Sequence, residues 1–237
     1  MGAIDKLVGH WQGINLETPF RIHQADQVAM DQAQPFDTGL MPYPYVRDIR
    51  GADVWVLMLN SNIGADGAQQ EAEPYFAQLL RDNLMQDFND VEYPILLLDP
   101  KLRETGTYKY YNNRNGTAKL IAEFARRSGT KEGRARRELS RRIAVLQLVP
   151  YRSTSGVPQK LLGNTLASVR LARAAVIEAL ESKLVIVPRS ARNWCFQYGI
   201  REKNLFTFKA CQARSASLRP GGACGGGDAI LNRLERG

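Results

Sequence analysis

The feature that most constrains the fold is a nearly continuous apolar run, Asp53-Val-Trp-Val-Leu-Met-Leu-Asn60, which has the length of one β-strand. A strand that is apolar on both faces is buried on both sides, and this is typical of a parallel sheet covered by helices. Similar apolar runs follow along the chain, and strands are expected there too: 93–98, 143–149, 184–187 and, more weakly, 205–208.

Amphipathic segments lie between these runs. Residues 71–85 place apolar side chains at helical spacing, and helices are also expected at 117–127, 162–181 and 228–234, with Asp228 as an N-cap. Strands that alternate with helices predict a three-layer αβα fold around a central, mainly parallel sheet of four to five strands. In such a sheet the active site lies at the carboxyl ends of the strands, so the residues that follow each strand matter most.

The first part of the chain is turn-rich. Residues 1–41 are expected to form an N-terminal extension that packs on the core of a domain spanning 42–237. The run Met41-Pro-Tyr-Pro-Tyr45 predicts an extended entry segment, because proline lacks an N–H donor and restricts the residue before it.

Cysteine and histidine are scarce. The three cysteines form no Cys-x-x-Cys pair, which argues against a disulfide framework and against a zinc or iron–sulfur site, and no metal or cofactor is expected. The chain has no apolar stretch of about 18 residues and does not begin like a signal peptide, so we expect a cytoplasmic protein that does not enter a membrane.

The chain is basic, with a formal net charge of +8 and a pI of about 9.5. Such a charge attracts phosphates, although many basic proteins bind no nucleic acid. Lysine and arginine are dense at 126–142, which predicts either a solvated helix face or a phosphate-contacting surface. Residues 214–227 are rich in Gly, Ser and Arg, which predicts either a flexible surface loop or a loop that approaches a DNA backbone.

Polar segments follow the expected strands in order: Asn60-Ser-Asn-Ile-Gly64, Pro150-Tyr-Arg-Ser153, Pro188-Arg-Ser-Ala-Arg192 and Ala213-Arg-Ser-Ala-Ser-Leu-Arg-Pro220. Taken together, over residues 42–234, they resemble the motifs of the uracil-DNA glycosylase superfamily, in the branches whose first motif reads Asn-Pro-Gly. Asn60 falls on the catalytic Asn of that motif. Ser61 and Asn62 replace its Pro and Gly, which leaves open whether Asn60 or Asn62 does the work.

The other segments depart from the family pattern as well. Arg152 stands where bacterial relatives have the His of a Pro-Tyr-His-Ser segment that lines the base pocket. The segment 213–220 takes the place of the second motif, often His-Pro-Ser, and it contains no His. The resemblance implies DNA contacts from this segment and from the one that follows the penultimate strand, namely Arg189, Arg192, Arg214, Ser215, Ser217 and Arg219.

The resemblance also implies roles at the base pocket, each with a plain alternative. Tyr151 would stack on the flipped base, or is ordinary core packing; Arg152 would hold a polar base substituent or a phosphate, or is a surface charge. The resemblance places Ser153, Ile63 and Gly64 in the lining of the pocket. Asn60 either has the catalytic role or caps a turn. Asp66, Glu71 and Glu73 are candidates for a base, but acids are also favoured near a helix N-terminus.

The resulting prediction is a monofunctional DNA glycosylase, since no lysine is placed to form a Schiff base. The chain resembles, in size and first motif, a bacterial offshoot that defends against phages whose hydroxymethylcytosine carries glucose, so the predicted substrate is that modified base in double-stranded phage DNA. The alternatives are repair of uracil or mismatched thymine, and a DNA-binding module without catalysis. A nucleotide- or sugar-binding enzyme ranks lower, because no glycine-rich phosphate loop follows the first strand. A monomer is expected.

Overall fold

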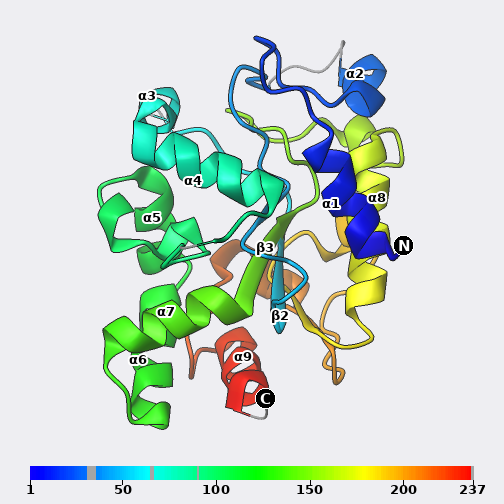
Figure 1. The fold of residues 1–237 in the computed structure, drawn as a ribbon. Helices are drawn as coiled ribbons and strands as arrows, with labels where there is room; N and C mark the ends of the chain where they lie inside the picture. Colours follow the sequence, from blue (N-terminus) through cyan, green and yellow to red (C-terminus); the bar gives the residue numbers. More distant parts are fainter. Residues whose placement is uncertain (31–35, 65–66, 90, 236–237) are drawn as a thin grey trace.

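A five-stranded sheet forms the centre of the protein (Figure 1). The structure is a computed structural model, and it describes residues 1–30, 36–64, 67–89 and 91–235. The strand order is β1-β3-β2-β4-β5. The strands are β1 (Tyr45–Val46), β2 (Val54–Met58), β3 (Ile143–Gln147), β4 (Leu184–Val187) and β5 (Leu205–Thr207).

The apolar run after Asp53 forms the central strand. Val56 of β2 lies opposite Val145 of β3 on one side and Ile186 of β4 on the other, and both pairings are parallel. All three side chains are buried, as expected for a strand covered on both faces. At one edge β1 pairs antiparallel with β3, with Tyr45 opposite Leu146. The mainly parallel αβα fold predicted from the sequence is therefore confirmed.

Helices cover both faces of the sheet. Figure 1 shows α4, α5, α6 and α7 on one side and α1 and α8 on the other. The α-helices are α1 (Ala3–Gln12), α2 (Gln24–Met30), α3 (Gly67–Ala72), α4 (Pro74–Met85), α5 (Gly106–Lys109), α6 (Thr117–Ser128), α7 (Glu132–Arg142), α8 (Ala167–Ala179) and α9 (Gly226–Glu235). Within the described ranges, no helix has the length and apolar character needed to cross a membrane.

Short helical turns make up much of the remaining chain. The 3₁₀ turns are η1 (Leu96–Leu98), η2 (Pro100–Leu102), η4 (Gln159–Leu161), η5 (Ala191–Trp194) and η6 (Ala210–Ser215), and η3 (Tyr110–Arg114) is a π-helix. A π-helical turn is rare and often lies at a functional site.

Two expected helices have different bounds in the structure. The helix expected at 162–181 begins only at Ala167, and Asp228 lies inside α9, which begins at Gly226, rather than at its N-cap.

Two further expected elements differ from the structure. The apolar run 93–98 is not a strand: it ends in the 3₁₀ turn η1, and its leucines are buried without joining the sheet. The expected helix 71–85 is two helices, α3 and α4, with a break at Glu73, whose backbone is extended ahead of Pro74. Proline disfavours helical geometry in the residue before it, so it begins a new helix here.

The N-terminal segment packs directly on the core. Leu7, Val8 and Trp11 of α1 are fully buried against the same hydrophobic cluster as the sheet, and the N-terminus of α1 donates hydrogen bonds to the carboxylate of Glu178 on α8. Further along, Phe36 forms an isolated antiparallel bridge with Ser153. The first part of the chain therefore reaches the carboxyl edge of the sheet, where the sequence places the functional residues.

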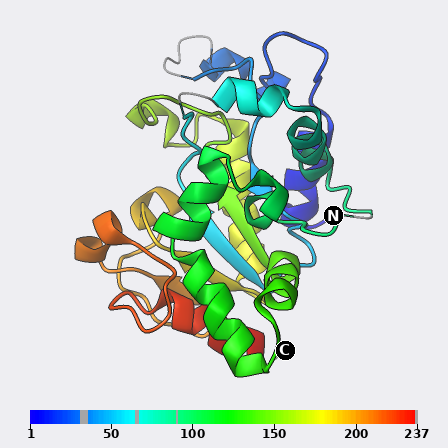
Figure 2. The ribbon, with the colours of Figure 1, turned by 90° about the vertical axis from the view of Figure 1, so that its left-hand side faces the viewer.

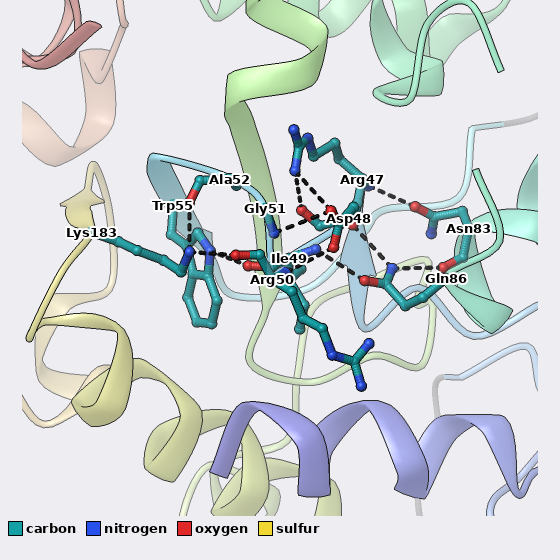
Figure 3. A network of polar contacts seen from close by, with 10 residues as sticks. All are labelled: Arg47, Asp48, Ile49, Arg50, Gly51, Ala52, Trp55, Asn83, Gln86 and Lys183. Atoms are coloured by element: carbon teal, nitrogen blue, oxygen red, sulfur yellow. Dashed lines mark hydrogen bonds and ion pairs between the residues drawn. The ribbon is translucent and has the colours of Figure 1, made fainter. Parts of the chain in front are cut away.

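The opposite, amino edge of the sheet is held by side chains that bond to the backbone (Figure 3). The amide of Asn83 accepts a hydrogen bond from the backbone N–H of Arg47 at 2.7 Å and donates one to the carbonyl of Tyr45 at 2.6 Å. The Nζ of Lys183 donates to the carbonyls of Arg50 and Ala52, each at 2.7 Å. These contacts fix the turn between β1 and β2, and we assign the network to folding.

Candidate functional site at the carboxyl edge of the sheet

Asn60 and Ser153 meet where β2 and β3 end. The Nδ2 of Asn60 donates a hydrogen bond of 2.6 Å to the Oγ of Ser153, and a longer one of 3.4 Å to the carbonyl of Ser61. Among the described residues, none donates a hydrogen bond to the amide oxygen of Asn60. Asn60 is half-buried, so that oxygen is fixed in direction and can accept a hydrogen bond from a ligand or a water molecule.

The backbone around this pair is also fixed. Ser153 is buried, its N–H donates to the carbonyl of Ser61 at 3.3 Å, and its carbonyl accepts from the N–H of Ile63 at 3.1 Å. Asn62 pairs with Ser153 through the backbone, whereas its side chain is exposed. Gly64 is exposed too and ends the described part of this loop, while Asp66 lies outside the described residues. The structure therefore brings Asn60, Ser153 and Ile63 together.

Tyr151 lies in the core next to this site. Its side chain is 2% exposed, and its ring packs edge-on against Trp11 and Phe36, with ring centres 5.9 Å and 6.3 Å away. Its hydroxyl donates to Asp26 at 2.9 Å and accepts from the N–H of His23 at 3.2 Å. These contacts favour the packing interpretation, and stacking on a base remains a prediction that requires the ring to leave this position.

Arg152 is buried in an ion pair, so its interpretation as a surface charge is wrong. Its guanidinium contacts the carboxylate of Glu71, both side chains are almost fully buried, and it lies 5.7 Å from the ring centre of Tyr43. Burial lowers the pKa of Arg152. Gly67 packs against Ile63 and Arg152, where a Cβ would approach the side chain of Ile63 to 3.0 Å. Arg152 and Glu71 thus form a buried ion pair next to the site. Because Glu71 pairs with Arg152, its carboxylate is not free to act as a general base.

Three residues that the motif comparison did not single out lie in the same region. Gln147 ends β3 and is 3% exposed, and its Oε1 has no hydrogen-bond partner among the described residues. The buried hydroxyl of Tyr43 likewise has no partner in the described chain. Tyr111, on the π-helix η3, interacts with Gln147, and burial raises the pKa of both tyrosines. The only feature of the sequence that could have pointed to this cluster is Gln147, a polar residue at the end of an otherwise apolar strand.

The predicted DNA-contacting residues fall in two places. Arg189 is half-buried and Arg192 is exposed in the turn after β4. Arg214 and Ser215 are exposed at the end of η6, and Arg219 is exposed further along the same segment. Ser217 differs, because its hydroxyl donates to the carbonyl of Asn115 at 3.2 Å and accepts from the N–H of Arg219 at 3.2 Å. Its hydroxyl therefore holds the segment in place.

The segment 214–227 packs against the core at Leu218, Gly226 and Gly227, and much of the chain between them is exposed. Gly226 packs under the ring of Phe208, and a Cβ on Gly227 would lie 2.2 Å from the carbonyl of Leu218. The N–H of Leu218 donates to the carbonyl of Asn115 at 2.7 Å. The glycines here allow the backbone to pack closely, which a flexible loop would not require.

The basic stretch 126–142 is only partly paired with carboxylates. Arg126 and Arg127 bond to Glu123, Arg137 bonds to Glu92, and Arg142 bonds to Asp53 at 2.5 Å. Arg136 bonds to the neutral side chain of Asn112, and no carboxylate of the described residues pairs with the other three cations of the stretch, so both interpretations of this surface stay open.

The described residues contain no cluster of three or more His, Cys, Asp or Glu side chains that could hold a metal ion, and Cys195, Cys211 and Cys224 are free thiols. Two surface hollows, of about 470 Å³ and about 390 Å³, are lined neither by Asn60 nor by Ser153. Neither a protein-family model, nor a curated protein, nor a solved structure matches this chain.

Proposed function

We propose that the protein is a DNA glycosylase that flips a base out of duplex DNA and hydrolyses the bond between that base and its sugar. The observation that carries this proposal is the amide of Asn60, which Ser153 holds in one orientation at the ends of two adjacent parallel strands. An open amide oxygen in a fixed direction suits the positioning of a water molecule.

The proposed chemistry follows from what an amide can do. Cleavage of a glycosidic bond builds positive charge on the sugar. The oxygen of Asn60 accepts a hydrogen bond from water and directs the water oxygen at the anomeric carbon. The carbon–oxygen bond forms as the carbon–nitrogen bond breaks, and the electron pair leaves with the base. The added water loses one proton to solvent, and the base takes up one proton from solvent. Since asparagine does not remove the proton from water, we expect a modest rate that depends on positioning.

Buried polar groups behind this point support recognition of a ring with donors and acceptors. The Oε1 of Gln147 is an acceptor and the hydroxyl of Tyr43 is a donor, and neither has a partner among the described residues. A buried polar group without a partner is costly, so a ligand that bonds to these two groups would gain free energy on binding. A base that entered here would supply an amino group for Gln147 and a carbonyl for Tyr43.

The charge of the chain supports DNA as the partner. The net charge is +8, and Arg192, Arg214 and Arg219 are exposed in the loops that follow β4 and β5. Long-range attraction of this kind brings phosphates to a surface before specific contacts form. We propose that the protein acts as a monomer in the cytoplasm on double-stranded DNA.

Within this class, we propose glucosylated hydroxymethylcytosine of phage DNA as the base, and therefore a role in defence against phages. The proposal is supported by the Asn-type first motif and by the polar groups near the strand ends. Removal of uracil or mismatched thymine in repair is the alternative within the class.

A second candidate is a DNA-binding module on the same fold that lacks catalysis. It is favoured by one observation: Tyr151 and Arg152, which would contact the base, are both buried and already paired. In such a protein the carboxyl edge would be structural, and only the exposed basic side chains would matter.

An excision assay separates these candidates. The protein is incubated with duplexes that carry one glucosylated hydroxymethylcytosine, hydroxymethylcytosine, cytosine, uracil or mismatched thymine, and abasic sites are then cleaved with alkali. We expect strand breaks with the glucosylated base, their loss in Asn60→Ala, and their retention in Asn62→Ala, which serves as the matched control because its side chain is exposed two residues away.

Other outcomes have clear meanings. Breaks with uracil or mismatched thymine alone would assign the protein to repair. Loss of activity in Asn62→Ala but not in Asn60→Ala would move the catalytic role to Asn62. Tight DNA binding without breaks on any duplex would sink the glycosylase proposal and leave the non-catalytic DNA-binding module.

A further inference from the structure

A groove lies between α6 and the segment just before α9, away from the Asn60–Ser153 pair. Figure 2 shows α6 beside this part of the chain. The groove has a volume of about 470 Å³. It is lined on one side by Lys119, Ala122, Glu123, Arg126 and Arg127, and on the other by Arg219, Pro220, Gly221 and Asp228.

The two sides are held at a fixed separation. Gly116, just ahead of α6, has a φ of +82°, and a Cβ there would lie 2.5 Å from the Oγ of Ser217 and 2.8 Å from the N–H nitrogen of Arg219. On the other side, the N–H of Gly221 donates to both carboxylate oxygens of Asp228, at 3.1 Å and 3.0 Å. These contacts hold the backbone that lines the groove on both sides.

The charge in the groove is not balanced. Four cations line it, and the two carboxylates, Glu123 and Asp228, bond mainly to Arg126, to Arg127 and to the backbone of Gly221. Lys119 and Arg219 are exposed, and no carboxylate of the described residues pairs with either. Arg126 keeps 71% of its side chain exposed although it bonds to Glu123. An anion of extended shape would complete this arrangement.

The spacing of the cations favours a chain of phosphates over one small anion. Lys119 and Arg126 are seven residues apart on α6, which is about 10 Å along the helix axis. Successive phosphates on one DNA strand rise by about 3.4 Å along the duplex axis, so Lys119 and Arg126 would contact different phosphates of that strand. Arg219 would reach the same backbone from the opposite side of the groove.

We propose that the groove between α6 and residues 219–221 holds a DNA phosphodiester backbone, gripped by Lys119 and Arg126 from one side and by Arg219 from the other. This rests on the proposed function insofar as DNA is the partner, but it assigns a contact surface on α6 that excision itself does not need.

Salt-dependent binding tests the groove without any modified base. Affinity for an unmodified duplex is measured by fluorescence anisotropy over a range of salt concentrations. Lys119→Gln and Arg219→Gln should each weaken binding and reduce the slope of log affinity against log salt by about 1. Lys131→Gln, an exposed lysine at the start of α7 that does not line the groove, is the matched control and should change neither.

A variant that is expected to bind DNA more tightly distinguishes the loss of a DNA contact from the loss of folding. Glu123→Gln removes the carboxylate that neutralises Arg126 and Arg127, so it should tighten binding and steepen the salt dependence. An unchanged slope in Lys119→Gln, or no gain in Glu123→Gln, would overturn the groove as a DNA site.

The two proposals can be contradicted separately. If the wild-type protein excises a base and Lys119→Gln binds DNA normally, the glycosylase proposal stands and the groove proposal is wrong. If Lys119→Gln weakens salt-dependent binding but no excision occurs, the groove proposal stands and the glycosylase proposal is wrong. If the wild-type protein neither binds DNA nor excises a base, both proposals are wrong.

Discussion

The imidazole ring of His10 stacks on that of His23, with ring centres 3.5 Å apart and planes inclined by 32°. Burial lowers the pKa of His10 to about 4, and burial also lowers the pKa of His23. The N–H of His23 donates to the hydroxyl of Tyr151, which in turn donates to the fully buried Asp26. The backbone of His23 is therefore linked through Tyr151 to the segment that holds Ser153, and the stacked pair is neutral in the folded state near neutral pH.

We predict that acid destabilises the protein through this pair. In the unfolded chain a histidine has a pKa near 6.5, so the unfolded state binds a proton at this position below that pH. In the folded state His10 stays unprotonated until the pH falls to about 4. The free energy of unfolding should fall as the pH drops from about 6.5 toward 4, and this contribution should level off below that. Urea unfolding at a series of pH values measures it. The variant His10→Phe keeps a ring on His23, and its stability should depend less on pH; an unaltered dependence would contradict the assignment.

Tyr151→Phe should destabilise the fold. The substitution removes the hydroxyl that donates to Asp26 at 2.9 Å, and Asp26 then keeps only the N–H of Ser168, at 3.1 Å, as a donor among the described residues. Leaving a buried acceptor underpaired costs about 1–3 kcal/mol. Tyr43→Phe is the matched control, because its buried hydroxyl has no partner in the described chain, and it should be neutral or stabilising. Equal losses in both variants, measured by chemical unfolding, would refute this account.

Gly227→Ala should lower stability by about 1–3 kcal/mol, because its Cβ would lie 2.2 Å from the carbonyl of Leu218 and would force the backbone apart. The same change at Gly133 in α7 meets nothing within 4 Å, and it should leave stability unchanged or raise it by up to about 1 kcal/mol. Thermal unfolding of the two variants gives the comparison. A Gly227→Ala protein as stable as the wild type would show that Gly227 does not pack tightly against the carbonyl of Leu218.

Arg152→Met should destabilise the protein strongly, by about 3–5 kcal/mol, because it leaves the buried carboxylate of Glu71 without its partner. Adding Glu71→Gln should recover part of this loss, since the remaining charge is then removed as well. A double-mutant cycle of unfolding free energies measures the coupling. Strictly additive losses would mean that the two side chains do not act as a pair.

The sequence predicted the sheet better than the parts around it. The apolar runs at 53–60, 143–149, 184–187 and 205–208 are strands, because burial on both faces leaves a continuous apolar pattern. The run 93–98 is apolar too, but it contains Pro94 and ends in the 3₁₀ turn η1, since an apolar run alone does not distinguish a strand from another buried segment. The two-residue strand β1 is too short to leave any pattern, and the prolines near it indicated only an extended chain.

The site was predictable in position and less so in detail. Parallel strands end at one edge, so Asn60 and Ser153 could be expected near each other, and they are bonded. Their neighbours depend on contacts between distant segments, which spacing does not reveal. Nothing local to Arg152 showed that Glu71 would pair with it, and nothing local to Tyr151 showed that Asp26 would bind its hydroxyl.

The packing of α1 on α8 has a consequence for how the protein assembles. The N–H of Ala3 bonds to a carboxylate 175 positions later in the chain, and Leu7, Val8 and Trp11 are buried by a helix pair whose other member, α8, begins at Ala167. During synthesis these apolar side chains leave the ribosome long before their partner, and contacts that span such a separation form slowly. The first helix is thus expected to dock late in folding, and the contact of Trp11 with Tyr151, two residues before Ser153, is expected to form only then.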